Sequence, residues 1–418
     1  MGSNFIGASD GNRTHATSLE GWDSTIELHS HVLATSTLIL YHKPPLLSIA
    51  KTKKILVFFK KFFAKLPIRY ATFTNMRYNK GIILKFGTEY TMTALKKIGK
   101  IALFALGGLL ALILLIWLVL FFGRYLLYRD FFAHREKEFQ IPGIHSGYVP
   151  QGLSNVDEEG SAFVLSGYNG KYLDLYYHDV KTNTSKRVLP VDENGEILEG
   201  HGGGLTVCKN YVYVSENDAL YTFYLSEIRA AEDGGKVTCH AIIPVDNQSS
   251  FCFVEGDFLY VGEFYRPVVY ETDPSHIYTT PAGEEHRAIV SCYRLNDDGS
   301  LAEKYPIYSI SIPSQVQGFA IKDNTIMLSR SWGLEQSVLE FYDGMRDSGT
   351  TISVSGREVP LYYLDSTNLK KEVQLPCFSE ELCVVGDRVY ISFESACNKY
   401  IVGKFFFATY IASYPIGE

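Results

Sequence analysis

Residues 312–329 read IPSQVQGFAIKDNTIMLS, and this stretch decides the fold because its plan recurs five times between residues 138 and 418. An aliphatic residue and a proline end one segment. After a loop come a polar or small residue, usually a glycine, and a large apolar residue, then a turn and a second apolar segment. The aliphatic–proline pairs are Ile141-Pro142, Leu189-Pro190, Ile243-Pro244, Ile312-Pro313 and Leu375-Pro376. The openings that follow are Gln151-Gly152-Leu153, Gly203-Gly204-Leu205, Ser250-Phe251-Cys252, Gln317-Gly318-Phe319 and Glu380-Glu381-Leu382. Such a period indicates a repeat protein.

Each unit is predicted to hold four antiparallel strands. The first two flank turns such as Lys209-Asn210 and Asp323-Asn324, whose residues tolerate a positive φ. A third strand is rich in aromatic and β-branched residues, and the fourth ends in the proline, which suits an edge strand. The third strands are expected at 173–180, 219–225, 288–295, 359–364 and 400–407. Four-stranded repeats of this kind are typical of β-propeller blades.

We therefore predict an all-β, five-bladed β-propeller over residues 131–418, behind a single N-terminal transmembrane helix. The chain ends after a third strand and the domain begins with an orphan fourth strand, Glu138–Pro142. Pairing the two would close the ring. The alternatives are an open β-sandwich with irregular repeats, and a degenerate sixth blade within 264–286 or 332–359.

Charge is divided unevenly along the 418 residues. Residues 1–100 carry 15 Lys+Arg and 5 Asp+Glu, which leaves 24 against 41 beyond residue 100 and a net charge of −17 there. A domain this acidic is a poor partner for nucleic acid, whose affinity for proteins depends on phosphate neutralisation. Cations, neutral sugars or basic partners fit it better.

One segment is long and apolar enough to cross a membrane. Residues 101–122 read IALFALGGLLALILLIWLVLFF, and 22 residues without a charge span a hydrocarbon core of about 30 Å. Arg124 follows the run, and Trp117 and Tyr125 suit the interface. We expect an uncleaved anchor (92–130 with its basic leader), a cytoplasmic N-terminus by the positive-inside rule, and a propeller outside a bacterial cell membrane on the stalk 124–137.

Residues 1–91 differ from the rest and share no repeat with it. We interpret them as translated upstream sequence, with Met76 or Met92 as the true start, or as a disordered cytoplasmic tail. The seven cysteines show no metal-binding spacing and lie mostly in apolar strands, so we expect buried small hydrophobes. One or two disulfides are the alternative if the domain is extracytoplasmic.

The loops that enter the inner strands and those that join second to third strands gather on one face of a propeller, over the channel mouth. They supply the candidate ligand-binding residues Gln151, His201, Glu216, Glu263, Gln317, Arg330, Trp332, Glu380 and Glu394. Glu216, Glu263 and Arg330 occupy the same offset on three successive blades, which predicts a charge cluster. That cluster is either a structural ion-pair network or a polar, cation-binding floor. The long loops 263–287 and 332–359 carry aromatic residues that would serve as a ligand lid or as packing.

At the level of architecture, the inner-strand openings resemble those of the gluconolactonase-like, NHL and quinoprotein-like propellers. Gluconolactonase-like members bind a divalent metal through a glutamate at such an opening. Here Val149-Pro150-Gln151-Gly152 has a glutamine at that place, which argues against metal-dependent hydrolysis. The sequence leaves the cofactor unknown, with Ca²⁺ as the one candidate.

The expected role is binding of a glycan, a peptide or an envelope protein at the cell surface. The alternative is a lactonase- or glycosidase-like hydrolase with Glu216, Glu263 and Glu394 as acid, base or metal ligands. A scaffold without a ligand is the third possibility. No catalytic residue is singled out by a motif.

Overall fold

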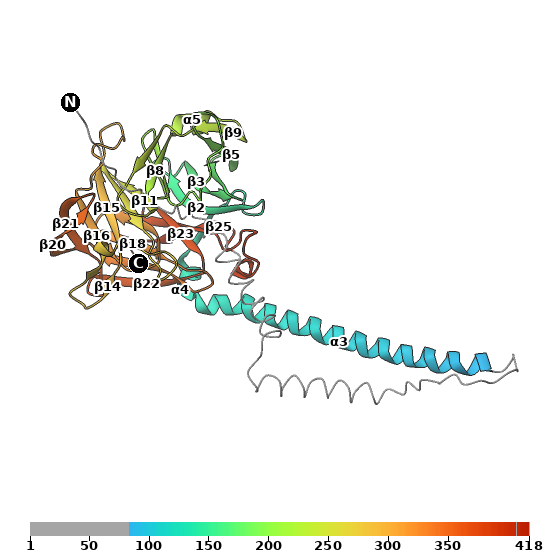
Figure 1. Cartoon of the computed structure of the whole chain (residues 1–418). Helices are drawn as coiled ribbons and strands as arrows, with labels where there is room; N and C mark the ends of the chain where they lie inside the picture. Colours follow the sequence, from blue (N-terminus) through green and yellow to red (C-terminus); the bar gives the residue numbers. More distant parts are fainter. Residues whose placement is uncertain (1–82, 407, 418) are drawn as a thin grey trace, which may run out of the picture. The chain divides into compact units, whose positions relative to one another are not determined.

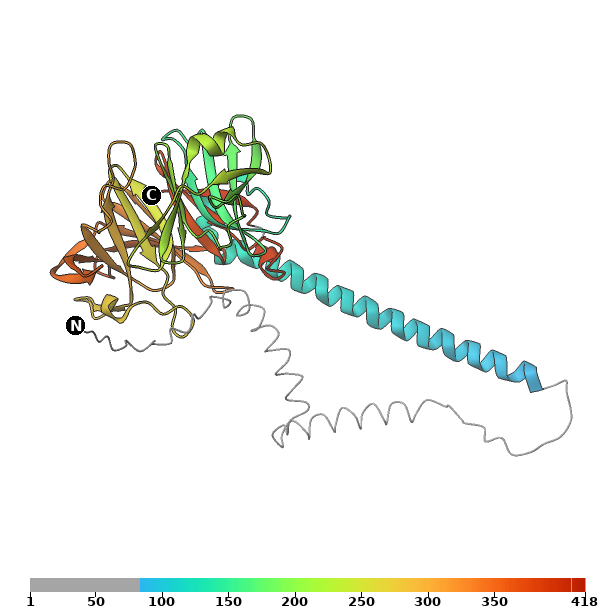
Figure 2. The same cartoon turned by 45° about the horizontal axis from the view of Figure 1, so that its top comes forward.

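A computed structural model describes residues 83–406 and 408–417, and Figures 1 and 2 show its β domain. Five four-stranded antiparallel sheets form the blades, as predicted. The first blade holds β2 (Tyr148–Asn155), β3 (Ala162–Asn169), β4 (Tyr172–Asp179) and β5 (Thr184–Val191). The second holds β6 (Leu205–Cys208), β7 (Tyr211–Glu216), β8 (Ala219–Tyr224) and β10 (Ala241–Pro244). The third holds β11 (Ser249–Glu255), β12 (Phe258–Glu263), β15 (Ala288–Arg294) and β16 (Tyr308–Ile312).

The fourth and fifth blades complete the ring. The fourth holds β17 (Val316–Lys322), β18 (Thr325–Arg330), β19 (Ser337–Asp343) and β22 (Leu369–Leu375). The fifth holds β23 (Ser379–Val385), β24 (Arg388–Phe393), β25 (Tyr410–Pro415) and β1 (Glu136–Gln140). Each inner strand contacts the next, in the order β2, β6, β11, β17, β23 and back to β2. The glycine of an opening allows this approach: a Cβ on Gly318 would lie 2.8 Å from Leu382 N.

Ring closure by the orphan strand is confirmed. β1 pairs antiparallel with β25, so the first strand of the domain is the outermost strand of its last blade. The position of the third strand in that blade was predicted wrongly, because it is β25 and not 400–407. Residues Gly403–Phe406 form a short 3₁₀ helix instead. Aromatic residues favour strands only where a pleated, half-buried surface receives them, and residues 404–406 have no neighbouring strand with which to pair.

The third strand expected at 359–364 was also wrong. β19 takes that place in the fourth blade, while β21 (Arg357–Tyr363) lies parallel to β16 and extends the third blade, with β20 (Arg346–Val354) beside it. β9 (Gly235–Thr238) extends the first blade in the same way. Residues 264–286 hold only η1 (Pro274–His276) and the two-residue strands β13 (Tyr278–Thr279) and β14 (Glu285–His286). The described residues thus hold no sixth blade.

Helix α3 (Ile83–Leu127) contains the predicted span. Lys96–Leu127 is long and apolar enough to cross a membrane by length and composition, with a mean hydropathy of 2.9. The interpretation of residues 1–91 falls largely outside the described part of the chain, although α3 runs through Met92. The expected stalk is not free. Phe131 of α4 (Arg129–His134) is 1% exposed and belongs to the core of the β domain.

The seven cysteines are free thiols, and six of them are buried. Their interpretation as small buried hydrophobes is therefore confirmed. Cys252 illustrates the environment: burial raises the pKa of its thiol far above the usual range, which keeps the thiol protonated and unreactive.

Candidate binding site at the channel mouth

Two glutamates of the fifth blade and a glutamine of the first blade meet at the channel mouth. Gln151 on β2 donates from Nε2 to Glu394 Oε2 over 2.9 Å. Glu380, on β23, is 3% exposed, and Glu394, directly after β24, is 7% exposed. These three predicted site residues are brought together because the inner openings of adjacent blades converge and the loop after β24 lies above them.

Burial decides the protonation of both glutamates. It raises the pKa of Glu394 to about 7, against the opposing effects of Lys399 and of hydrogen bonds from Tyr400 and Gln151. The pKa of Glu380 is raised well above its ordinary value, first by burial and then by the charges of Glu394 and Glu381. Two adjacent buried carboxyls cannot both ionise at low cost. Burial and mutual repulsion therefore both favour the protonated form of the pair.

The rim of this site includes residues that the sequence did not single out. Lys399 Nζ donates to Tyr168 OH over 2.6 Å, and the Tyr400 ring stacks on Phe378 with centroids 4.3 Å apart. Lys399 and Tyr400 escaped notice because 400–407 was interpreted as a strand. Recognition of the loop as the second-to-third connection of the fifth blade would have included them.

His201 reaches the same rim from the second blade. Its ring lies 4.8 Å from that of Tyr168, and the side chain is accessible to solvent. Glu216 holds the loop: its Oε2 accepts from Gly202 N over 2.6 Å. Burial raises the pKa of Glu216 to about 7, although hydrogen bonds from the Gly202 and His201 backbone lower it. Glu216 thus stabilises the loop that carries His201.

Glu263 supports a loop as well. It is 1% exposed, contacts His276 Nδ1 at 2.9 Å and accepts from Ile289 N over 3.1 Å. These contacts tie the long loop 264–287 to the third blade. His276 has a raised pKa: the Glu263 hydrogen bond and charge outweigh its burial, which is the largest single effect and acts downward.

Arg330 does not bridge Glu216 and Glu263. It forms an ion pair with Glu340 on the neighbouring strand β19 and donates from Nε to Ser314 O over 3.0 Å. Among the described residues, no ion pair joins the three predicted members of the charge cluster. Glu340 is the partner of Arg330 because β18 and β19 are neighbours within one sheet.

Trp332 and Gln317 complete the predicted set. The Trp332 ring stacks near Phe264 at 5.8 Å and meets Tyr270 edge to face at 5.9 Å. Tyr270 has a raised pKa, caused first by burial and then by the Glu394 charge. Trp332 therefore packs against Tyr270. Gln317 lies half-buried on β17.

Glu381, next to Glu380, lies among the inner strands. It is fully buried, and a side chain at Gly204 of the second blade would collide with its Oε2. Burial raises the pKa of Glu381 well above its ordinary value, although backbone N–H groups of Cys252 and Phe319 favour its charged form. Glu381 is thus enclosed by the inner strands of neighbouring blades.

The mouth does not fit Ca²⁺. Across residues 83–406 and 408–417, no three His, Cys, Asp or Glu side chains are placed to hold a metal ion. Ca²⁺ requires several oxygen ligands, mostly ionised carboxylates. Gln151 contributes a neutral amide, Lys399 adds a positive charge, and burial favours the protonated form of the two glutamates.

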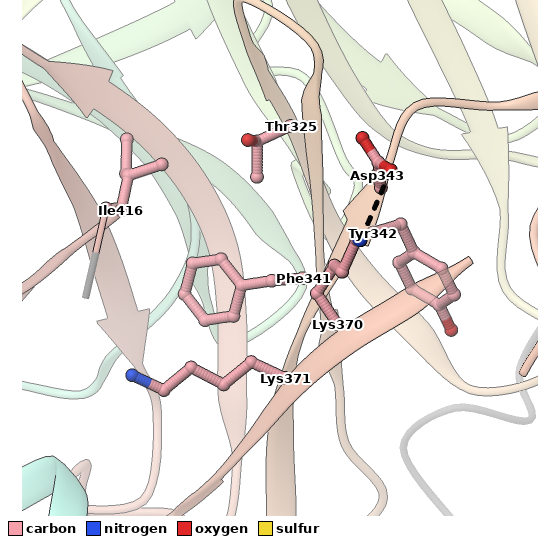
Figure 3. A pocket seen from close by; sticks show the side chains of 8 residues that line it. Thr325, Phe341, Tyr342, Asp343, Lys370, Lys371 and Ile416 are labelled. Atoms are coloured by element: carbon pink, nitrogen blue, oxygen red, sulfur yellow. Dashed lines mark ion pairs between the residues drawn. The ribbon is translucent and has the colours of Figure 1, made fainter. Parts of the chain in front are cut away.

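Two surface depressions lie away from this mouth. Figure 3 shows the first, of about 290 Å³, where Lys370 pairs with Asp343 at 3.4 Å. Phe341, Lys371 and Ile416 also line it. The second, of about 740 Å³, lies between β1 and the first blade and includes His178 and Arg187. Neither contains a residue of the mouth site.

Comparison with known proteins supplies no family. No family model matches the chain, and no curated protein matches it. Solved structures resemble it weakly. A luciferin-regenerating enzyme is 12% identical with a TM-score of 0.35, covering 66% of this chain and 94% of its own. A nidogen/laminin complex chain is 8% identical with a TM-score of 0.32, covering 59% and 73%. A chain from Thermus thermophilus assigned as an oxidoreductase (glucose dehydrogenase) is 11% identical with a TM-score of 0.34, covering 67% and 99%. The propeller assignment rests on the sheet topology of this chain.

Proposed function

We propose that the protein is a single-pass, membrane-anchored propeller that binds a neutral, hydroxyl-rich ligand, such as a glycan, at its channel mouth. The observation that carries the proposal is the buried Glu380–Glu394 pair and its hydrogen bond from Gln151. A protonated carboxyl both donates and accepts hydrogen bonds, as sugar hydroxyls do. Tyr270 and Tyr400 are half-buried aromatic residues that are held by Trp332 and Phe378, and sugar rings commonly pack on such side chains.

The positive-inside rule supports a cytoplasmic N-terminus and a propeller outside the cell membrane, because Lys96, Lys97 and Lys100 precede the apolar run. A tag at the C-terminus should then be reached by protease in intact cells. Protection of that tag until the cells are lysed would reverse the orientation. An envelope protein or a peptide is the competing partner, and the acidic domain disfavours nucleic acid.

The binding experiment uses the full-length protein in nanodiscs, a glycan array and calorimetry across pH 5.5–8.5. A ligand that covers the mouth removes water from the glutamates, so binding favours their protonated form. We expect the affinity to fall above pH 7 and the fall to be lost in Glu394→Gln. Glu199→Gln is the matched control, since Glu199 is exposed and pairs with Lys171. An array without any binder would refute the proposal.

One observation favours a hydrolase as the second candidate. Two interacting carboxyls of which one keeps its proton are a common acid–base arrangement. Turnover of aryl glycosides or lactones that is abolished by Glu394→Gln would establish the enzyme. Turnover that depends on Glu263 and not on Glu394 would place the active site outside the Glu380–Glu394 pair. We do not expect this, because Glu263 already contacts His276 and accepts from a backbone N–H group.

A further inference from the structure

The loop between β24 and β25 exposes an apolar tip that the binding site does not use. Ile401 is 80% exposed, Val402 44% and Phe405 36%. The tip is held in place, since Gly403 packs against the Ser395 backbone and Lys404 Nζ donates to Asn398 Oδ1 over 2.6 Å. Exposed apolar groups on an ordered loop indicate a contact surface.

This tip lies at the end of the candidate membrane span. Arg124 Nη1 donates to Phe406 O over 3.3 Å, and the rings of Tyr128 and Phe406 have centroids 6.2 Å apart. Arg124 closely follows the apolar run, where a helix leaves the hydrocarbon and enters the interface. Leu126 and Leu127, a little further along, are 81% and 57% exposed. The loop tip and the C-terminal end of α3 therefore lie side by side, and each exposes apolar side chains.

Basic residues flank the tip. Lys404 belongs to the loop, Lys399 precedes it, and Arg129 follows the helix, with Asp130 beside it. Basic residues beside an apolar tip are the arrangement of segments that lie in an interface with anionic lipid. The bilayer is thus the occupant that both the position and the charge favour.

We propose that residues 401–405 insert into the interfacial layer of the bilayer that α3 crosses, which rests on the proposed anchoring. The same loop carries Lys399 and Tyr400 into the mouth site. The ligand is therefore recognised beside the lipid headgroups, as a glycan of the membrane surface would be.

Photocrosslinking in the full-length protein tests the insertion. The protein is reconstituted in vesicles of mixed zwitterionic and anionic phospholipids, with p-benzoylphenylalanine in place of Val402, and lipid adducts are measured by mass spectrometry. Val180 is the matched control: it is a valine with 43% exposure in the β4–β5 turn. Leu114, in the middle of the span, reports on anchoring itself. Near-native melting temperatures show that each labelled protein is folded.

We expect lipid adducts at positions 402 and 114 and at least tenfold fewer at 180. Adducts at 114 without adducts at 402 would overturn the inference and leave the anchor intact. A crosslink from 402 to a second copy of the chain would also overturn it. A lack of adducts at 114 would refute the proposed anchoring and, with it, the insertion. Equal yields at 402 and 180 would show that contact with lipid is unspecific and would refute a defined insertion.

Discussion

Gln151 Nε2 donates to Glu394 Oε2 over 2.9 Å, and this bond joins the first blade to the fifth. The fifth blade is also where β1 closes the ring on β25. We call the contact between the fifth blade, with its outer strand β1, and the first blade the seam of the propeller. The candidate site and the seam thus involve the same two blades. Changes at the seam are expected to affect ligand binding and stability together.

Replacement of Phe139 tests the seam. This side chain of β1 is 5% exposed and contacts the first blade, with its ring 4.1 Å from that of His178 and 4.9 Å from that of Phe163. Phe139→Ala should lower the free energy of unfolding by about 3–4 kcal/mol, as large-to-small changes in cores do. Chemical denaturation measures this. Val180→Ala, at an exposed site, should cost less than about 0.5 kcal/mol. Equal losses would show that β1 is not needed for closure.

Glu216 should make the stability depend on pH. Burial raises its pKa from an ordinary 4.5 to about 7, so the folded state binds this proton more tightly than the unfolded state. The resulting stability is complete below pH 4.5 and is lost as the pH rises to about 7, a change of roughly 3 kcal/mol. The melting temperature of Glu216→Gln should therefore change less between pH 4.5 and pH 8 than that of the wild type. A profile parallel to the wild type, or flattening in the exposed control Glu199→Gln, would contradict this assignment.

The pair of Arg330 and Glu340 predicts a further stability effect. Glu340 is 1% exposed, and its pKa is raised by burial while Arg330 opposes the rise. Arg330→Ala removes the cation and should cost roughly 2–4 kcal/mol, since a buried charge loses its partner. Glu340→Gln in the same chain should recover part of this loss, as a double-mutant cycle would show. Arg346→Ala, at an exposed pair with Asp343, should change little. An additive cycle would mean that the two side chains do not interact energetically.

Gln151→Glu tests whether the residue at this position sets the fit of the mouth to Ca²⁺. The variant places a third carboxyl beside Glu380 and Glu394, so like-charge repulsion should lower the melting temperature at pH 8. Millimolar Ca²⁺ should restore part of it, because three carboxylates can then ionise around the cation. The wild-type melting temperature should not respond. A Ca²⁺ response of the wild type equal to that of the variant would show that Gln151 is not what opposes the metal.

The sequence by itself determined the architecture. The aliphatic–proline endings and the polar–small–apolar openings recur because every blade must end in an edge strand and pack an inner strand at the axis. Both constraints act on single positions. Pro313 marks the end of an edge strand, and Gly318 marks an inner strand that packs closely on its neighbour. The count of five and the closure by β1 followed from them. The candidate membrane span at 101–122 could also be predicted from the sequence, because such a span is identified by the length and composition of one continuous segment.

Only the tertiary structure decided which strand segment belongs to which sheet and which polar groups meet. β21 and the segment 400–407 have similar strand propensity to true third strands, and propensity does not say where a strand pairs. Arg330 pairs with Glu340 instead of two glutamates at matching offsets, since a side chain chooses its partner by distance across the sheet. Glu394, with Lys399 and Tyr400 beside it, joins Gln151 from 243 positions away. Proximity of that kind is a property of ring closure, which brings distant segments together, and no local pattern records it.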